Sequence, residues 1–121
     1  MRVVIVGAGK LGYTIAELLS SEGIEVVVVD KDESQLTAVK ETLDVMTINK
    51  SGTNPTTLDD PDINRAEVLI AVTSTDEVNM VACILAKKHG INHTIARIRD
   101  IQFMGEAREY VKKNFDIDLL L

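Results

Sequence analysis

Aromatic side chains are scarce in this sequence. They account for 3% of its 121 residues, and tryptophan is absent. Hydrophobic residues nevertheless make up 45% of the chain, so the core must consist mainly of valine, isoleucine, leucine and alanine. Such a composition favours strands that are buried on both faces, as in parallel sheets covered by helices. The shortage of aromatics also removes the stacking platforms on which single-stranded nucleic acids bind.

Basic residues are outnumbered, since 13 lysines and arginines face 19 aspartates and glutamates. A protein that follows a phosphate backbone needs a basic face, so we expect no nucleic-acid partner. The single cysteine, Cys83, excludes an intrachain disulfide and provides no metal-binding pattern, so we also expect no metal site.

Long hydrophobic runs are missing as well. Apolar runs such as residues 68–72 are far shorter than the roughly 20 residues that a membrane helix needs. The first residues form a strand-like run without the basic region and cleavage site of a signal peptide. We therefore expect a cytoplasmic domain with no direct insertion into the membrane. Because no linker or repeat divides the chain, we expect one domain over residues 1–121.

Short apolar runs alternate with amphipathic segments along the chain. The runs predict strands at residues 3–6, 26–29, 45–48, 68–72, 94–98 and 117–121. Helices are predicted from Leu11, Ile15, Leu18 and Leu19, from residues 33–43, and over 77–89 and 102–114. Residues 49–61 predict a loop around at most one helical turn. This alternation predicts the α/β class: a Rossmann-type, doubly wound, mainly parallel six-stranded sheet with helices on both faces.

The most informative motif follows the first predicted strand and reads Gly7-Ala8-Gly9-Lys10-Leu11-Gly12, which we call the glycine loop. Gly7 lets the chain turn, Gly9 leaves room for a pyrophosphate beside the backbone, and Gly12 lets the next helix pack closely. The free N–H groups at that helix N-terminus attract phosphate. Strand, loop and helix together predict a site for an adenine dinucleotide or a related nucleotide.

An acidic residue, Asp30, ends the second predicted strand, 18 residues after Gly12. A carboxylate there accepts hydrogen bonds from ribose hydroxyls and repels a 2′-phosphate, which favours NAD-like over NADP-like ligands. The alternative is a solvated strand end or an N-cap of the next helix. Lys31 follows and would tolerate some phosphate. Lys10, within the glycine loop, is either a phosphate contact or an ordinary surface lysine.

Polar residues also follow the fourth predicted strand, at residues 73–79. At the carboxyl end of a central strand this segment faces the ligand crevice. Thr73 and Asn79 are the candidates for ligand contacts, because each offers a short hydrogen-bonding group. Thr75 and Asp76 instead favour capping of the following helix.

Arg97 lies in the fifth predicted strand, where a guanidinium needs an anionic partner, either a ligand phosphate or an internal carboxylate. No catalytic constellation accompanies it. His89 and His93 are separated by Gly90, and Cys83 lies among apolar residues. A dehydrogenase also needs a second structure that presents its substrate, so we expect that the chain is not an enzyme.

Four separated motifs resemble the nucleotide-binding domain of Trk-type potassium-uptake regulatory proteins, a family called TrkA-N, KTN or RCK. They are the glycine loop, Val29-Asp30-Lys31-Asp32, residues 71–80, and Ile95-Ala96-Arg97-Ile98-Arg99. The resemblance implies a cytoplasmic gating subunit that senses NAD(H) or ATP/ADP and is peripherally associated with the inner face of the plasma membrane. It implies a potassium-conducting integral membrane subunit as partner, assembly into a homodimer or larger ring, and a C-terminal ligand-sensing lobe that this chain lacks.

The resemblance also implies roles for individual residues. Phosphates are assigned to Gly7, Gly9 and Gly12, the distal phosphate to Lys10, the adenosine ribose to Asp30, and the other side of the nucleotide to Thr73, Asn79 and Arg97. Leu11, Lys31, Ser51 and Thr53 complete the expected site. The family often reads Gly-Asp-Ala-Thr after the third strand, whereas this chain has Lys50-Ser51-Gly52-Thr53. Ser51 thus replaces an acidic residue near the adenine, and Thr53 still fits.

Two other interpretations stay open from the residues alone. One is the cofactor domain of a two-domain dehydrogenase, and the other is a nucleotide-dependent interaction module without a transport partner. Within the family interpretation, we expect long and short nucleotides to engage Lys10 and Arg97 to different extents. Such a difference would let the bound nucleotide shift a ring between two states.

Overall fold

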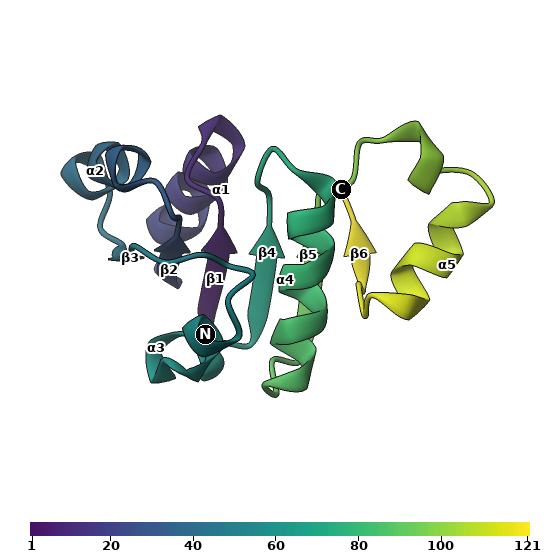
Figure 1. Cartoon of the computed structure of the whole chain (residues 1–121). Coiled ribbons are helices and arrows are strands. Elements are labelled where there is room, and N and C mark those ends of the chain that lie inside the picture. The colour runs from purple at the N-terminus through teal and green to yellow at the C-terminus, as the bar shows by residue number, and fades with distance from the viewer.

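Six parallel strands form the centre of the computed structural model, which describes residues 1–121 (Figure 1). The strands are β1 (Arg2–Val6), β2 (Glu25–Val29), β3 (Met46–Ile48), β4 (Val68–Ala71), β5 (His93–Ala96) and β6 (Leu119–Leu120). Their order in the sheet is β3-β2-β1-β4-β5-β6. The chain therefore begins at the centre and winds outward first to one side and then to the other, which confirms the predicted doubly wound fold.

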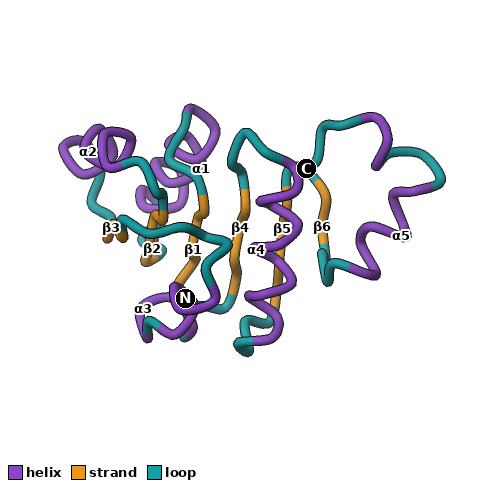
Figure 2. Tube along the Cα trace, in the orientation of Figure 1, coloured by secondary structure: helices purple, strands orange, loops and turns teal.

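Five helices and two 3₁₀ turns connect the strands. They are α1 (Lys10–Ser21), α2 (Glu33–Thr42), η1 (Pro55–Asp59), α3 (Pro61–Asn64), α4 (Asp76–Lys88), η2 (Ile101–Phe103) and α5 (Ala107–Asn114). Helix α5 lies beside the outer strand β6, whereas α1 and α2 lie toward the β3 end of the sheet (Figure 2). None of the helices combines the length and the apolar character needed to cross a lipid bilayer.

The core has two layers, one on each face of the sheet. Val4 and Val6 of β1 pack on the face that α4 covers, whereas Val3 and Ile5 pack with residues of α1 and α2. Successive residues of a strand point to opposite faces, so each strand supplies both layers. Residues 3–6 of the central strand β1 are buried, and Ile5 has no exposed surface. This is the two-sided burial that the valine-rich and isoleucine-rich runs predicted.

Two predictions for connecting segments are wrong. Residues 49–61 contain η1 and the start of α3, because Asn54 and Asp60 each cap a turn that a proline then begins. The helix predicted over 102–114 is split into η2 and α5. Gly105 interrupts it with a φ of +61°, a left-handed conformation that glycine adopts readily.

Leu18, one of the four apolar residues whose spacing predicted helix α1, lies outside the core. Its side chain is 60% exposed. In helix α1, Gly12 and Ala16 are buried against the sheet, and Leu11 and Leu19 are partly buried beside them. A helix that rests on a sheet buries only one stripe of its surface, and Leu18 lies outside the stripe.

Candidate nucleotide-binding site

A cavity of about 370 Å³ opens at the carboxyl ends of β1, β2 and β4. Here the chain changes its winding direction, because α1 leads from β1 toward β2 whereas α4 leads from β4 toward β5. Such a switch point is where open α/β sheets bind their ligands. The lining includes seven of the predicted site residues: Gly7, Gly9, Asp30, Lys31, Ser51, Thr53 and Thr73.

Two glycines of the loop are required by the protein itself. Gly7 has a φ of +113°, and a Cβ atom there would lie 3.0 Å from the backbone of Val72 and Thr73. A Cβ atom on Gly12 would lie 1.8 Å from the carbonyl oxygen of Gly7. A side chain at either position would therefore disrupt the turn from β1 into α1.

Gly9 differs from these two, because nothing in the chain explains its missing side chain. Its φ of −72° and ψ of −168° suit any residue, and no atom lies within 4 Å of the position that a Cβ would take. The space beside Gly9 belongs to the cavity that Gly9 lines. A bare backbone at this point allows a ligand to approach the start of α1 closely.

The N-terminus of α1 carries free hydrogen-bond donors. Gly9 provides no side-chain cap, and the first turn contains no acidic residue. The N–H groups of Lys10, Leu11 and Gly12 find no acceptor in the chain, while the next one, of Tyr13, donates to the Gly9 carbonyl at 2.8 Å. The N-terminus of α2, in contrast, is capped by Asp32. Open N–H groups and the helix dipole together attract an anion such as phosphate.

Asp30 follows β2 and holds the glycine loop. One carboxylate oxygen accepts the N–H of Ala8 at 2.8 Å, and the other accepts the N–H of Asp32 at 2.8 Å. Because Asp32 caps α2, the interpretation of Asp30 as the helix cap is wrong. Each oxygen of an ionised carboxylate has further lone pairs, so Asp30 remains able to accept hydrogen bonds from a ligand. The crevice therefore has an acceptor on its β2 side.

The segment after β3 forms the outer rim. The Ser51 and Thr53 hydroxyl oxygens lie 2.9 Å apart, and the Thr53 N–H donates to the Ser51 oxygen at 3.2 Å. Between them, Gly52 packs on β1 so closely that a Cβ atom would lie 2.4 Å from a methyl carbon of Val6. A glycine here brings the two hydroxyls against the end of the central strand.

Asn79 does not line the cavity, which corrects the predicted ligand contact. Its side chain is completely buried. Its amide nitrogen donates to the carbonyl oxygens of Thr73, at 3.2 Å, and Arg97, at 2.8 Å. Asn79 therefore joins the segment after β4 to the end of β5, and Thr73 alone of this pair lines the cavity.

The predicted caps of α4 are also corrected. Thr75 occupies the N-cap position, but its side chain forms no capping hydrogen bond. The carboxylate of Asp76 accepts the N–H groups of Arg99, at 3.0 Å, and Asp100, at 2.7 Å. Asp76 thus anchors the segment after β5 instead of the helix to which it belongs.

Lys10 and Arg97 lie outside the residues that line the cavity. Lys10 is exposed at the first position of α1. Arg97 follows β5 and is half-buried, and its guanidinium forms no ion pair with any carboxylate of the chain. The alternative of an internal carboxylate partner for Arg97 is therefore wrong.

Sequence reasoning missed several residues of the lining: Asp32, Gln35, Gly52, Ser74, Thr75 and Val78. Ser74 and Thr75 belong to the polar run after β4, where capping was the simpler interpretation. Gln35 lies on the exposed side of α2, and no local pattern marks it. It reaches the crevice only because α2 begins directly after the loop that carries Asp30.

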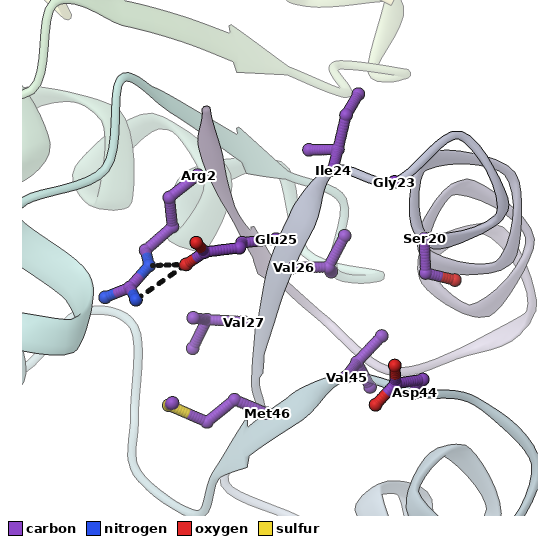
Figure 3. Close-up of a pocket in the computed structure, with 10 residues that line it drawn as sticks. All are labelled: Arg2, Ser20, Gly23, Ile24, Glu25, Val26, Val27, Asp44, Val45 and Met46. Carbon is purple, nitrogen blue, oxygen red and sulfur yellow. Dashed lines mark hydrogen bonds and ion pairs between the residues drawn. The ribbon is translucent and has the colours of Figure 1, made fainter.

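A second cavity, of about 300 Å³, lies at the opposite edge of the sheet (Figure 3). Arg2 borders it, but the guanidinium is already bound to Glu25 by hydrogen bonds of 3.1 and 2.8 Å, and it also pairs with Asp62. The bond to Glu25, the largest influence, raises the pKa of Arg2 above its usual value. This cluster joins the amino ends of the strands and leaves the Arg2 charge already paired.

Several known proteins are similar to this chain in sequence or in structure. The Trk system potassium uptake protein TrkA of Halomonas elongata is 37% identical over the whole chain, which covers 27% of that protein. The GsuK channel bound to NAD superposes with a TM-score of 0.83 at 18% identity, over 99% of this chain and 21% of that one. The Kef C-terminal domain of Shewanella denitrificans in its AMP-bound form gives 0.78 at 19% identity, over 100% and 70%.

The chain thus spans about a quarter of the length of the Halomonas relative. The structural neighbours, at their low identities, establish the fold alone. The family model described as the TrkA-N domain matches residues 3–116, which include the glycine loop, Asp30, Thr73 and Arg97. This chain therefore belongs to the TrkA-N domain family, as its four motifs predicted.

Proposed function

We propose that this chain is a nucleotide-sensing regulatory domain of a Trk-type potassium transport system, and that it binds NAD(H) or ATP/ADP at the glycine loop. The observation that carries the proposal is Gly9. Neither its backbone conformation nor a close contact within the protein requires a glycine at this position. Gly9 also borders both a cavity and an uncapped helix N-terminus.

The crevice provides one feature for each part of an adenine nucleotide. A phosphate fits the free N–H groups of Lys10, Leu11 and Gly12. The ribose hydroxyls fit the carboxylate of Asp30, which already lies beside the glycine loop. The adenine would then lie toward Ser51 and Thr53 on the outer rim.

The proposed partner is a potassium-conducting integral membrane subunit. The relative from Halomonas elongata is named a potassium uptake protein, and GsuK is named a channel that was bound to NAD. By this similarity, we propose a cytoplasmic domain at the inner face of the membrane that works as a homodimer or larger ring. Its role would be gating and not catalysis, since the crevice lining consists mainly of glycines, hydroxyls, carboxylates and an amide that suit binding.

A ligand can shift a ring only if it binds the two states of that ring with different affinities. Lys10 and Arg97 suit such a role because both carry free positive charges outside the cavity. Nucleotides of different length would reach them to different extents. If Lys10→Ala and Arg97→Ala left the relative affinities for NADH, ATP and ADP unchanged, this role would be refuted.

Titration calorimetry with NAD⁺, NADH, ATP, ADP and NADP⁺ tests the binding proposal. We expect NAD⁺ to bind more tightly than NADP⁺, because the Asp30 carboxylate repels a 2′-phosphate. Asp30→Ala should weaken NAD⁺ binding by about tenfold or more, since a hydrogen bond to a charged group contributes about 1.5–3 kcal/mol. Asp44→Ala, at an exposed position beside the opposite cavity, is the matched control. Absence of nucleotide binding by the wild-type chain would overturn the proposal.

A further inference from the structure

We propose that the Thr73 hydroxyl is a selective hydrogen-bond acceptor at the β4 side of the crevice, and that Asn79 is the positioning residue that makes it so. The site would accept the second ribose or the carboxamide of a dinucleotide in preference to the terminal phosphate of a nucleoside triphosphate. This inference rests on the proposed nucleotide binding and extends it to the part of the ligand beyond the first two phosphates.

The orientation of the Asn79 amide is set by four hydrogen bonds. Its nitrogen donates to two carbonyl oxygens, those of Thr73 and Arg97. Its oxygen accepts the N–H of Thr73 at 2.9 Å and lies 2.7 Å from the Thr73 hydroxyl. An exchanged orientation would place the NH₂ group against the Thr73 N–H and the oxygen against the two carbonyls, so that donors meet donors and acceptors meet acceptors. The buried amide therefore has one orientation.

This orientation decides where the hydroxyl proton of Thr73 points. The Asn79 oxygen has no proton to give, so the Thr73 hydroxyl must be the donor in their 2.7 Å contact. The other acceptor within reach, the Thr75 carbonyl at 3.2 Å, is also a protein atom. In both cases the single proton is used inside the protein. A ligand that reaches this hydroxyl from the cavity that Thr73 lines would therefore meet lone pairs only.

One lone pair remains for a ligand. A hydroxyl oxygen has two, and the N–H of Thr75 approaches one of them at 3.3 Å. Ribose hydroxyls and the NH₂ of a carboxamide can donate to the second lone pair. An ionised phosphate oxygen has no proton, and its charge would be repelled by the hydroxyl oxygen. Thr73 therefore distinguishes ligands by the chemical group that follows their second phosphate.

The position of Thr73 matches that part of the ligand. Strand β1 lies between β2 and β4, so the glycine loop lies between Asp30 on one side and Thr73 on the other. The Thr73 nitrogen lies only 3.0 Å from the point where a Cβ on Gly7 would be. With the adenosine ribose at Asp30 and the first two phosphates, which NAD⁺ and ATP share, at the glycine loop, the next group along the ligand comes to Thr73. In NAD⁺ this group is the second ribose, and in ATP it is the terminal phosphate.

Calorimetric titration of Thr73→Val, Thr73→Ser and the wild-type chain with AMP, NAD⁺, ADP-ribose and ATP tests the inference. Valine keeps the branched shape and the main-chain N–H that Asn79 accepts, but it removes the hydroxyl, whereas serine retains it. We expect Thr73→Val to weaken NAD⁺ binding about fivefold, the contribution of one neutral hydrogen bond. The affinity of Thr73→Val for AMP should remain unchanged and its affinity for ATP should be equal to or higher than that of the wild type, whereas Thr73→Ser should bind NAD⁺ like the wild type.

ADP-ribose identifies the donor group, because it carries the second ribose without the carboxamide. Weaker ADP-ribose binding by Thr73→Val would assign the ribose hydroxyl, and an effect on NAD⁺ alone would assign the carboxamide; each supports the inference. Equal losses for NAD⁺ and ATP, or no loss for NAD⁺, would overturn it. If the wild type bound none of the four ligands, the proposed function would fail first. Thermal unfolding of each variant shows whether a loss reflects folding, and Thr73→Ala replaces valine if the valine variant unfolds.

Discussion

Replacing Gly9 by serine should separate folding from ligand binding. The backbone of Gly9 has a φ of −72° and a ψ of −168°, and no atom lies within 4 Å of a Cβ built there. A serine at this N-cap position could accept one of the free N–H groups of α1. We therefore expect the free energy of unfolding to change by only a few tenths of a kcal/mol, in the stabilising direction.

The same serine should prevent nucleotide binding. Its side chain would occupy the space beside the backbone donors and take one of them. Loss of about two hydrogen bonds to a charged phosphate, at roughly 1.5 kcal/mol or more each, would reduce the affinity by about a hundredfold or more. Gly12→Ala is the opposite case. Its Cβ would lie 1.8 Å from the Gly7 carbonyl oxygen, so we expect a loss of about 3 kcal/mol or more in stability.

The assay combines urea unfolding, followed by circular dichroism, with calorimetric titration of NAD⁺. Gly9→Ser should unfold like the wild type and bind no NAD⁺ at concentrations that saturate the wild type. Gly12→Ala should show a melting temperature lower by about 10 °C. Wild-type affinity in Gly9→Ser would refute the assignment of the space beside Gly9 to a ligand. Wild-type stability in Gly12→Ala would refute the close approach of α1 to the turn.

Two further predictions concern ionisable side chains away from the crevice. Burial acts to raise the pKa of Asp118, but hydrogen bonds from Lys87 and Thr94 outweigh it and hold the pKa below its usual value. This stabilisation is present above the unfolded pKa of about 3.9 and is lost as the pH falls through the folded one. Asp118→Asn should therefore lower the urea midpoint at neutral pH, and the difference from the wild type should shrink below about pH 4; a difference that stays constant would contradict this. Burial raises the pKa of Cys83 to about 12. The native chain should resist iodoacetamide at about pH 8 while the denatured chain reacts, as mass spectrometry would show; rapid labelling of the native chain would mean that α4 opens.

Several elements could be predicted from the sequence because their signals are local. The alternation of valine-rich runs with amphipathic segments is a property of neighbouring residues, and it was sufficient to predict a doubly wound sheet. The roles of Gly7 and Gly12 also follow from local geometry, since a turn from a strand into a helix brings their backbones together. Asp30 was located because it directly follows a recognisable strand.

The directions in which the polar side chains point depend on tertiary contacts. Asn79 was predicted in the crevice, yet it is buried beneath it, because its partners include the carbonyl of Arg97, 18 residues further along the chain. Asp76 was predicted as a cap, yet it accepts the N–H groups of Arg99 and Asp100 from the segment after β5. Such partners come together only when strand ends that are distant in sequence become neighbours at one edge of the sheet, and no local pattern records that. Local patterns were therefore enough for the fold and the glycine loop, while the packing of α4 against β4 and β5 determined which polar groups face a ligand.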